Sequence, residues 1–374
     1  MAGALALCLL SVGHTRPFVP KDEGTLLAEV PAGARHSEVA TLSAARARVD
    51  VALPLAQLYI KQARASGDLR YLGYAEAVLE PWIGPSASSA DALVLHATVL
   101  QSRHEFSEAL RVLERARGLR PGDPQAWLTT ATVLRVIGEY DRSLAACDQL
   151  AARADAAVIG LCREGLRALT GSLPAAYSAV ASIPSREMSP EERAWRDSEL
   201  GEMAVRLGQD EAAEHWFRNA LHFSPSDFYV RAAYADLLLR QRRATDVLTL
   251  LRGEDSLEPL LLRIAIAQKM LRDAGLTRSS ARLAAAFAAE EQRGDGVHRR
   301  EEARYFLEVT GDPQAAVATA QRNWQVQREP DDILILLRSA RAAGRPEAAR
   351  PAVEFVHQHG LEDVRMTADV DGRI

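Results

Sequence analysis

The chain has 374 residues, and its 45 Lys and Arg against 50 Asp and Glu give a net charge of -5. Hydrophobic residues make up 48% and charged residues 25% of the chain, which excludes a wholly disordered protein. The chain has no excess of positive charge with which to hold nucleic acid or acidic membranes. Its three cysteines are too few for a disulfide framework. The apolar residues are mainly Ala and Leu, which favour helices.

The N-terminus begins with an apolar run over residues 2–12, AGALALCLLSV. This run is shorter than the about 20 apolar residues that a membrane-spanning helix needs. Ser11 and Gly13 are small residues at the positions that a signal peptidase reads. We therefore expect a signal peptide over residues 1–13 and a periplasmic or secreted protein. No Lys or Arg precedes the run, so a cytoplasmic protein remains the alternative.

Residues 14–52 are expected to form an extended lead-in that ends in a short helix. Five helix-breaking residues occur between positions 14 and 35, namely Pro17, Pro20, Gly24, Pro31 and Gly33. Proline cannot continue a helix because it lacks a backbone N–H and its ring clashes with the preceding turn.

Beyond the lead-in, turn-like sites recur at intervals of 33 to 37 residues. Each lies between two apolar-periodic stretches of about a dozen residues, the length of a short helix. Glycine suits a tight turn between two helices because it reaches positive φ without a Cβ clash. The sites are Gly67, His104, Gly138, Gly171, Gly208, Arg242, Gly275, Gly311 and Gly344.

The unit over residues 194–227 shows the pattern most fully. Small residues occupy its places eight and twenty, Gly201 and Ala213, and Phe217 and Pro225 occupy places twenty-four and thirty-two. This 34-residue pattern resembles the tetratricopeptide repeat (TPR). Small residues at these places let two helices approach closely, and proline ends the second helix. A single hairpin cannot bury its apolar face alone, so neighbouring units must stack.

The resemblance implies an all-α, right-handed solenoid of stacked helix-turn-helix repeats over residues 53–363, followed by a flexible tail over 364–374. A plain helical bundle would not repeat a turn at this interval eight times. The expected units, of which the outer ones rest on continuity, are 53–86, 90–123, 124–157, 157–190, 194–227, 228–261, 261–294, 297–330 and 330–363.

The sequence shows no recognisable motif for catalysis, metal binding or phosphate binding. No phosphate-binding loop of the G-x-x-x-x-G-K-[ST] type and no G-x-S-x-G motif occur. His104-Glu105 begins like a zinc-protease motif, but Glu108 stands where the second His is needed. His357 and His359 are two residues apart and point to different sides of a helix. The sequence therefore predicts no catalytic residue, no metal site and no cofactor, and the protein is interpreted as a non-enzyme.

Cys147 and Cys162 fall in the second helix of one unit and the first helix of the next, which should touch. In an exported chain these two cysteines can form a disulfide, because the compartment is oxidising. We favour the interpretation that both are small buried apolar residues.

The family that the chain resembles binds its ligands in a concave groove lined by the first helix of each unit. The matching positions here form a polar set with several Arg, whose planar group can grip a carboxylate or a backbone carbonyl. They are Lys61, Arg64, Gln101, Thr132, Arg135, Trp195, Glu202, Arg206, Tyr229, Asp236 and Arg240. Aromatic side chains such as those of Trp195 and Tyr229 are enriched at binding hot spots.

The resemblance therefore implies a non-catalytic scaffold or adaptor that binds a peptide segment of a partner protein in this groove. The expected partner is a protein or peptide, with no nucleic acid and no stable membrane span in the mature chain. The alternative is an accessory subunit of an envelope enzyme or transporter complex, which would bind through its ends or its convex face.

Overall fold

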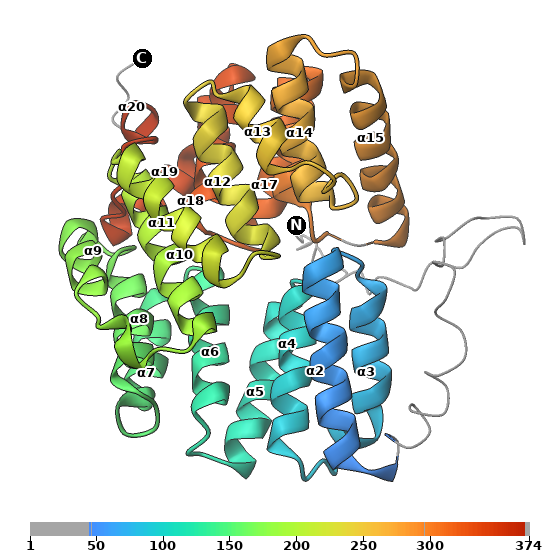
Figure 1. The fold of residues 1–374 in the computed structure, drawn as a ribbon, viewed down its shortest axis with the longest axis vertical. Helices are drawn as coiled ribbons and strands as arrows, with labels where there is room; N and C mark the ends of the chain where they lie inside the picture. The colour runs from blue at the N-terminus through green and yellow to red at the C-terminus, as the bar shows by residue number, and fades with distance from the viewer. Residues whose placement is uncertain (1–44, 46, 295, 371–374) are drawn as a thin grey trace, which may run out of the picture.

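The computed structural model describes residue 45, residues 47–294 and residues 296–370. The signal-like segment and most of the lead-in lie outside these residues. The described part of the chain consists of helices and their connections and contains no strand (Figure 1). The predicted all-α fold is thus confirmed.

Consecutive helices pack together as hairpins along the chain. The pairs are α2 (Val49–Ser66) with α3 (Arg70–Ile83), α4 (Ala90–Ser102) with α5 (Phe106–Leu119), α6 (Pro124–Val136) with α7 (Tyr140–Asp148), α8 (Ala156–Arg167) with α9 (Leu173–Ala181), α10 (Pro190–Arg206) with α11 (Asp210–Phe223), α12 (Phe228–Arg240) with α13 (Ala244–Leu250), α14 (Glu258–Leu271) with α15 (Leu276–Arg293), α16 (Arg299–Arg304) with α17 (Pro313–Trp324), and α18 (Pro330–Ala342) with α19 (Arg350–His359). A π-helical turn, Tyr305–Thr310, continues α16. Short 3₁₀ helices occupy Gln149–Ala152, Ser185–Glu187 and Pro346–Ala349, and α20 (Thr367–Val370) ends the described chain.

The turns inside the hairpins use left-handed backbone conformations. Eight of the nine sites expected from the sequence have positive φ, including the non-glycine residues His104 and Arg242, both at 60°. The site expected at Gly275 is displaced. Arg272 takes the left-handed conformation there, with φ 54°, and Gly275 has φ -63° at the start of α15. The backbone N–H of Gly275 donates to the Asp273 carboxylate at 2.7 Å, so an Asx turn extends this connection past the helix end.

Polar side chains fix the starts of several first helices. The Asp123 carboxylate accepts hydrogen bonds from the backbone N–H groups of Gln125 and Ala126, and Asp227 accepts one from Val230. Ser189 and Glu192 form a reciprocal capping box at the start of α10. Such caps satisfy N–H groups that have no partner inside the helix. They therefore set where each repeat begins.

Small residues let the paired helices touch, as the repeat pattern predicts. Ala97 and Ala109, which face each other's helix in the α4–α5 pair, are fully buried. In the α10–α11 pair the ring of Phe217 packs directly on Gly201, where a Cβ atom would lie 2.5 Å from the ring. A real Cβ would not tolerate that distance, so the close approach of α10 and α11 depends on glycine.

Replacing Gly201 with valine should lower the free energy of unfolding by about 1–3 kcal/mol, because the Phe217 ring must move out of a filled core. Gly118→Ala is the matched control. Gly118 lies near the end of α5, and a Cβ there would meet no atom within 4 Å. This change should leave stability unchanged or raise it by up to about 1 kcal/mol through helix propensity. Urea denaturation measures both effects, and equal stability of the two variants would contradict the packing argument.

Cys147 and Cys162 form a disulfide, with their Cα atoms 5.7 Å apart. The interpretation favoured from the sequence, two unbonded apolar residues, is therefore wrong. The bond joins α7 to α8, and Ala131, Ala146 and Trp127 pack around it. The two helices belong to neighbouring repeats, and their stacking brings the two cysteines within bonding reach. The disulfide fastens one repeat to the next.

The two halves of the solenoid meet, so the concave groove expected from the sequence becomes a central cavity that is partly open to solvent. The backbone N–H of Arg328 donates to the carbonyl of Val136 at 2.8 Å, across 192 residues of chain. One apolar cluster joins Tyr140, Leu166 and Leu169 to the side chains of α17–α19. Figure 1 shows the α14–α15 pair lying over the end of the α2–α3 pair, where Leu257 contacts Gly67. The small rotation added by each repeat accumulates over the solenoid until its two halves meet.

The last described segment packs onto the solenoid instead of extending from it as a tail. The backbone N–H of Val364 donates to the carbonyl of Arg206 at 3.0 Å. Met366 is 1% exposed within the C-terminal core. The Glu362 side chain accepts a hydrogen bond from the backbone N–H of Leu173 at 2.8 Å. Residues 361–366 therefore seal the contact between the last repeat and the repeats in the middle of the chain.

Candidate functional site: a central cavity

A cavity of about 1600 Å³ lies inside the closed solenoid. Its walls are built mainly from first helices of the hairpins, namely α2, α4, α6, α10, α12, α14, α16 and α18, with further residues from α3, α5, α8, α11 and the connections. Pockets for small molecules usually measure about 300–1,000 Å³. This cavity is larger and has room for a segment of polypeptide.

All eleven groove positions named from the sequence line this cavity. The structure brings together side chains that are up to 179 residues apart, from Lys61 on α2 to Arg240 on α12. Lys61, Arg64 and Tyr229 are exposed to the space, whereas most of the others are engaged by neighbouring side chains or by backbone. The positions share one location, but they do not share one role.

Arg206 is buried in the cavity wall and bound by backbone carbonyls. The residue is 6% exposed, and its guanidinium donates hydrogen bonds to the backbone carbonyls of Glu362, at 3.1 and 3.2 Å, and of Ala168. It thus ties α10 to both the C-terminal segment and the end of α8. Peptide binding by Arg206 stays a prediction, and these hydrogen bonds would compete with it.

Asp236 and Arg240 are also committed within the protein. The Asp236 carboxylate pairs with Arg263 at 2.6 Å and with Arg304 at 2.9 Å. Burial opposes ionisation of Asp236, but the two guanidiniums hold its pKa well below its usual range. Arg240 pairs with Asp210 on the neighbouring helix. These ion pairs connect α12 with α11, α14 and α16 around the cavity wall.

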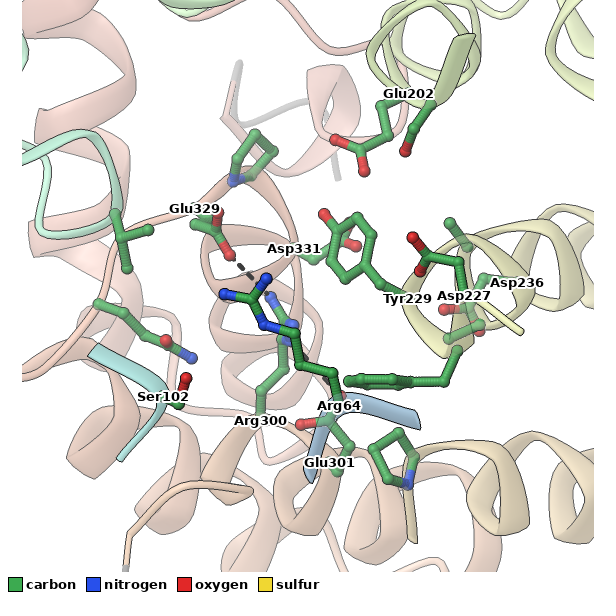
Figure 2. Close-up of a pocket in the computed structure, with 18 of the residues that line it drawn as sticks. Arg64, Ser102, Glu202, Asp227, Tyr229, Asp236, Arg300, Glu301, Glu329 and Asp331 are labelled. Atoms are coloured by element: carbon green, nitrogen blue, oxygen red, sulfur yellow. Dashed lines mark hydrogen bonds and ion pairs between the residues drawn. The ribbon is translucent and has the colours of Figure 1, made fainter. Parts of the chain in front are cut away.

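A cluster of acids lies on the α10 side of the cavity. Arg135 donates to Glu199 at 2.8 Å, and Trp195 donates to the same carboxylate at 3.3 Å. Glu202 has no cation paired with it among the described residues. Burial, together with the nearby Glu199 charge, raises the pKa of Glu202 to about 8, and the hydroxyl of Tyr229 partly offsets this rise. Glu202 is therefore mainly a neutral carboxylic acid at neutral pH. Figure 2 shows it facing Tyr229 across the cavity.

Glu202→Gln should make stability less sensitive to alkaline pH. The raised pKa means that Glu202 favours the folded state below pH 4.5, the usual value, and that this contribution is lost as pH rises through about 8. The variant cannot ionise, so it should be more stable than wild type at pH 9 by on the order of 2 kcal/mol, discounted for the water in the cavity. Melting temperatures at pH 5 and pH 9 measure this. An unchanged difference between the two proteins at both pH values would contradict it.

The C-terminal helices contribute cavity residues that the sequence reasoning missed. They include Arg300 and Glu329, which pair at 3.4 Å (Figure 2), and Asp331, which pairs with Arg365 at 2.9 Å. Arg338 on α18 also lines the cavity. The repeat pattern is weak in this part of the chain. These residues enter the site because the solenoid closes, which no local signal indicates.

The described residues hold no group of three or more His, Cys, Asp and Glu side chains arranged for a metal ion. His359, named from the sequence, packs against the rings of Phe355 and Tyr140 at 4.4 and 4.7 Å between centroids. In the part of the chain that the structure describes, none of the helices has the length and apolarity needed to cross a membrane.

No family model matches the chain, and no curated protein matches it. Among solved structures, the human IFIT1 dimer with PPP-AAAA is 12% identical, with 79% of this chain and 70% of that chain covered and a TM-score of 0.48. Yeast Tom70 is 10% identical, with 87% and 94% covered and a TM-score of 0.27. The P58(IPK) TPR domain is 15% identical, with 76% and 96% covered and a TM-score of 0.26. The chain is an α-solenoid of TPR-like repeats. That fold rests on the helix pairs themselves, and these likenesses add no information on function.

Proposed function

We propose that the protein is a non-catalytic binding protein that takes a peptide segment of a partner protein into its central cavity. The observation that carries this proposal is the cavity of about 1600 Å³, walled by first helices from along the whole solenoid. Its lining mixes charged and polar side chains with apolar ones, as a surface for an extended peptide does. Tyr229, which is 44% exposed, offers a flat aromatic surface for contact within it.

Site-specific photo-crosslinking tests this function. A benzoylphenylalanine at position 229 reports on the cavity, and one at position 144 reports on the outer surface, because Leu144 is 38% exposed and does not line the cavity. In extracts of the native host, the probe at 229 should crosslink to a single short segment of a partner. A synthetic peptide of that segment should compete with the crosslink.

Crosslinks that form from position 144 and not from position 229 would contradict the proposal. They would favour the alternative, an accessory subunit that binds through its convex face. Turnover of a substrate by the purified protein would contradict the non-catalytic part of the proposal.

The proposal also includes export to an oxidising compartment. The disulfide between Cys147 and Cys162 supports it, because disulfides persist in such compartments and are rare in reducing cytosol. N-terminal sequencing of the mature protein should find a start near residue 14. A mature protein that retains Met1 and has both thiols free would contradict export.

A further inference from the structure

The cavity contains cations that have no carboxylate partner. Arg263, Arg300, Arg304 and Arg365 all form ion pairs with Asp or Glu side chains. Four other lining cations form no hydrogen bond or ion pair through their side chains among the described residues, and these are Lys61, Arg64, Arg242 and Arg338.

Among these four, Arg64 and Arg338 have guanidiniums whose pKa is lowered in the folded protein. Burial lowers the pKa of Arg64, and Asp227 offsets this only partly. Burial likewise lowers the pKa of Arg338, with Glu308 as the partial offset. Arg64 lies in the last turn of α2, where the helix dipole favours a cation. Arg64 is exposed to the cavity and Arg338 is half-buried, and neither guanidinium has a side-chain hydrogen bond or ion pair among the described residues. An anionic group of a ligand would supply the negatively charged partner that the protein does not provide for these two guanidiniums.

The unpaired carboxylates of the cavity do not balance these cations. Asp227 caps α12 and accepts a hydrogen bond from the backbone N–H of Val230 at 3.1 Å. Glu191 and Glu258 lie in the first turns of α10 and α14, where the helix dipole stabilises a negative charge. Glu202 is mainly uncharged at neutral pH, as described above. Four unpaired cations thus face three ionised unpaired carboxylates, and the lining carries a small excess of positive charge within a chain of net charge -5.

Resting on the proposed function, we propose that the cavity binds a peptide segment carrying Asp or Glu side chains, whose carboxylates are received by Arg64 and Arg338. Guanidinium groups bind carboxylates through two parallel hydrogen bonds. Lys61 lies three residues before Arg64 on the same face of α2, so a second acidic side chain of the segment finds a cation there. Figure 2 shows Arg64 reaching into the space near Tyr229 and Glu329.

The lining favours an acidic peptide over a nucleic acid. Eleven Lys and Arg residues and ten Asp and Glu residues line the cavity. A nucleic acid carries one phosphate charge per nucleotide and would meet these carboxylates along its whole length, whereas a peptide can place its acidic side chains only opposite the unpaired cations. Binding of single strands also uses several aromatic platforms for the bases. Among the described residues, Tyr229 is the one lining aromatic with more than a third of its side chain exposed.

Selection from a peptide pool tests the inference. The pool consists of random ten-residue peptides with acetylated N-termini and amidated C-termini, so that side chains supply all the charge. Peptides retained by the immobilised full-length protein are identified by mass spectrometry. Wild type should enrich peptides that contain Asp and Glu. Arg64→Gln and Arg338→Gln should each bind the best acidic peptide at least about tenfold more weakly, the effect of losing a hydrogen bond between charged groups.

The matched control is Arg278→Gln. Arg278 is exposed on α15 and lies outside the cavity lining, so this variant loses the same charge and should bind as wild type does. Because Arg64 forms no described side-chain hydrogen bond or ion pair, Arg64→Gln should also keep the melting temperature of wild type. A single-stranded RNA of ten nucleotides with a 5′-phosphate serves as a competitor.

The outcomes separate this inference from the proposed function. Peptides retained without acidic enrichment, or equal binding by Arg64→Gln and wild type, would overturn the inference and leave peptide binding in place. Retention of no peptide would overturn both. Displacement of the acidic peptide by the RNA at the lower concentration would replace the inferred ligand with a nucleic acid.

Discussion

Asp236→Ala should lower the free energy of unfolding by about 3 kcal/mol, the low end of the range for breaking a buried ion pair. Its carboxylate is the shared partner of Arg263 and Arg304, whose side chains are 6% and 15% exposed. Removing it leaves two enclosed guanidiniums with fewer partners. Arg263 keeps the Glu301 carboxylate at 3.5 Å, and Arg304 keeps Glu308 at 2.9 Å. Because these pairs remain, we expect the loss in free energy of unfolding to lie near the lower end of that range.

Asp210→Ala is the matched control. Asp210 also pairs with an Arg lining the cavity, Arg240, but the two side chains are 32% and 29% exposed. Removal of such an exposed pair should cost at most about 1 kcal/mol. Urea denaturation at pH 7 measures both variants. If Asp236→Ala and Asp210→Ala cost the same, the network around Asp236 contributes no more than a surface pair does.

The effect of Asp236→Ala should depend on pH in a defined direction. The pKa of Asp236 is depressed in the folded protein, so the carboxylate stabilises the fold above the usual Asp pKa of about 4. That contribution is lost as pH falls toward the depressed folded-state pKa. The difference in stability between wild type and Asp236→Ala should therefore be full at pH 6 and shrink as pH is lowered below 4. A difference that grows on acidification would contradict this assignment.

The repeat architecture could be predicted because its determinants are local. Gly201 and Phe217 lie sixteen residues apart, and their contact follows from two adjacent helices joined by one turn. Eight of the nine turns likewise adopt positive φ where the sequence indicates. The exception at Gly275 arose because an Arg, Arg272, takes the left-handed conformation that glycine favours, and a composition-based pattern does not anticipate that choice. The disulfide was missed for a related reason: neighbouring repeats could be expected to touch, but the sequence does not fix the distance between Cys147 and Cys162.

The candidate site could be predicted only in part. The positions on α2–α12 follow from the repeat frame, and all of those named line the cavity. Which of them are free could not be read from that frame. Arg206 is occupied by the carbonyl of Glu362, 156 residues further along the chain. Closure of the solenoid depends on the summed curvature of all its repeats, and it both brings backbone carbonyls against Arg206 and adds Arg300 and Arg338 to the site.

Removal of the disulfide should be the other large effect on stability. In the chain-entropy account, a cross-link that closes a loop of 15 residues, the separation of Cys147 and Cys162, stabilises the folded state by about 3 kcal/mol. The double variant Cys147→Ala with Cys162→Ala should lose about this amount, as measured by thermal and urea denaturation without reductant. Alanine is chosen because Cys147 is 1% exposed, and serine would bury an additional hydroxyl there.

Reductant supplies the internal control for this prediction. With dithiothreitol, the stability of wild type should fall close to that of the double variant. The stability of the double variant should not change, because it has no bond between these positions to lose.

Alkylation before reduction should leave Cys147 and Cys162 of wild type unmodified. Labelling of both residues in the unreduced protein would contradict the bond itself. Labelling of neither, with stability unaffected by reductant, would show that the α7–α8 junction is held by the packing of Trp127, Ala131 and Ala146 rather than by the cross-link. If the double variant is less stable than wild type only under oxidising conditions, the stability of the folded protein depends on the redox state of its compartment.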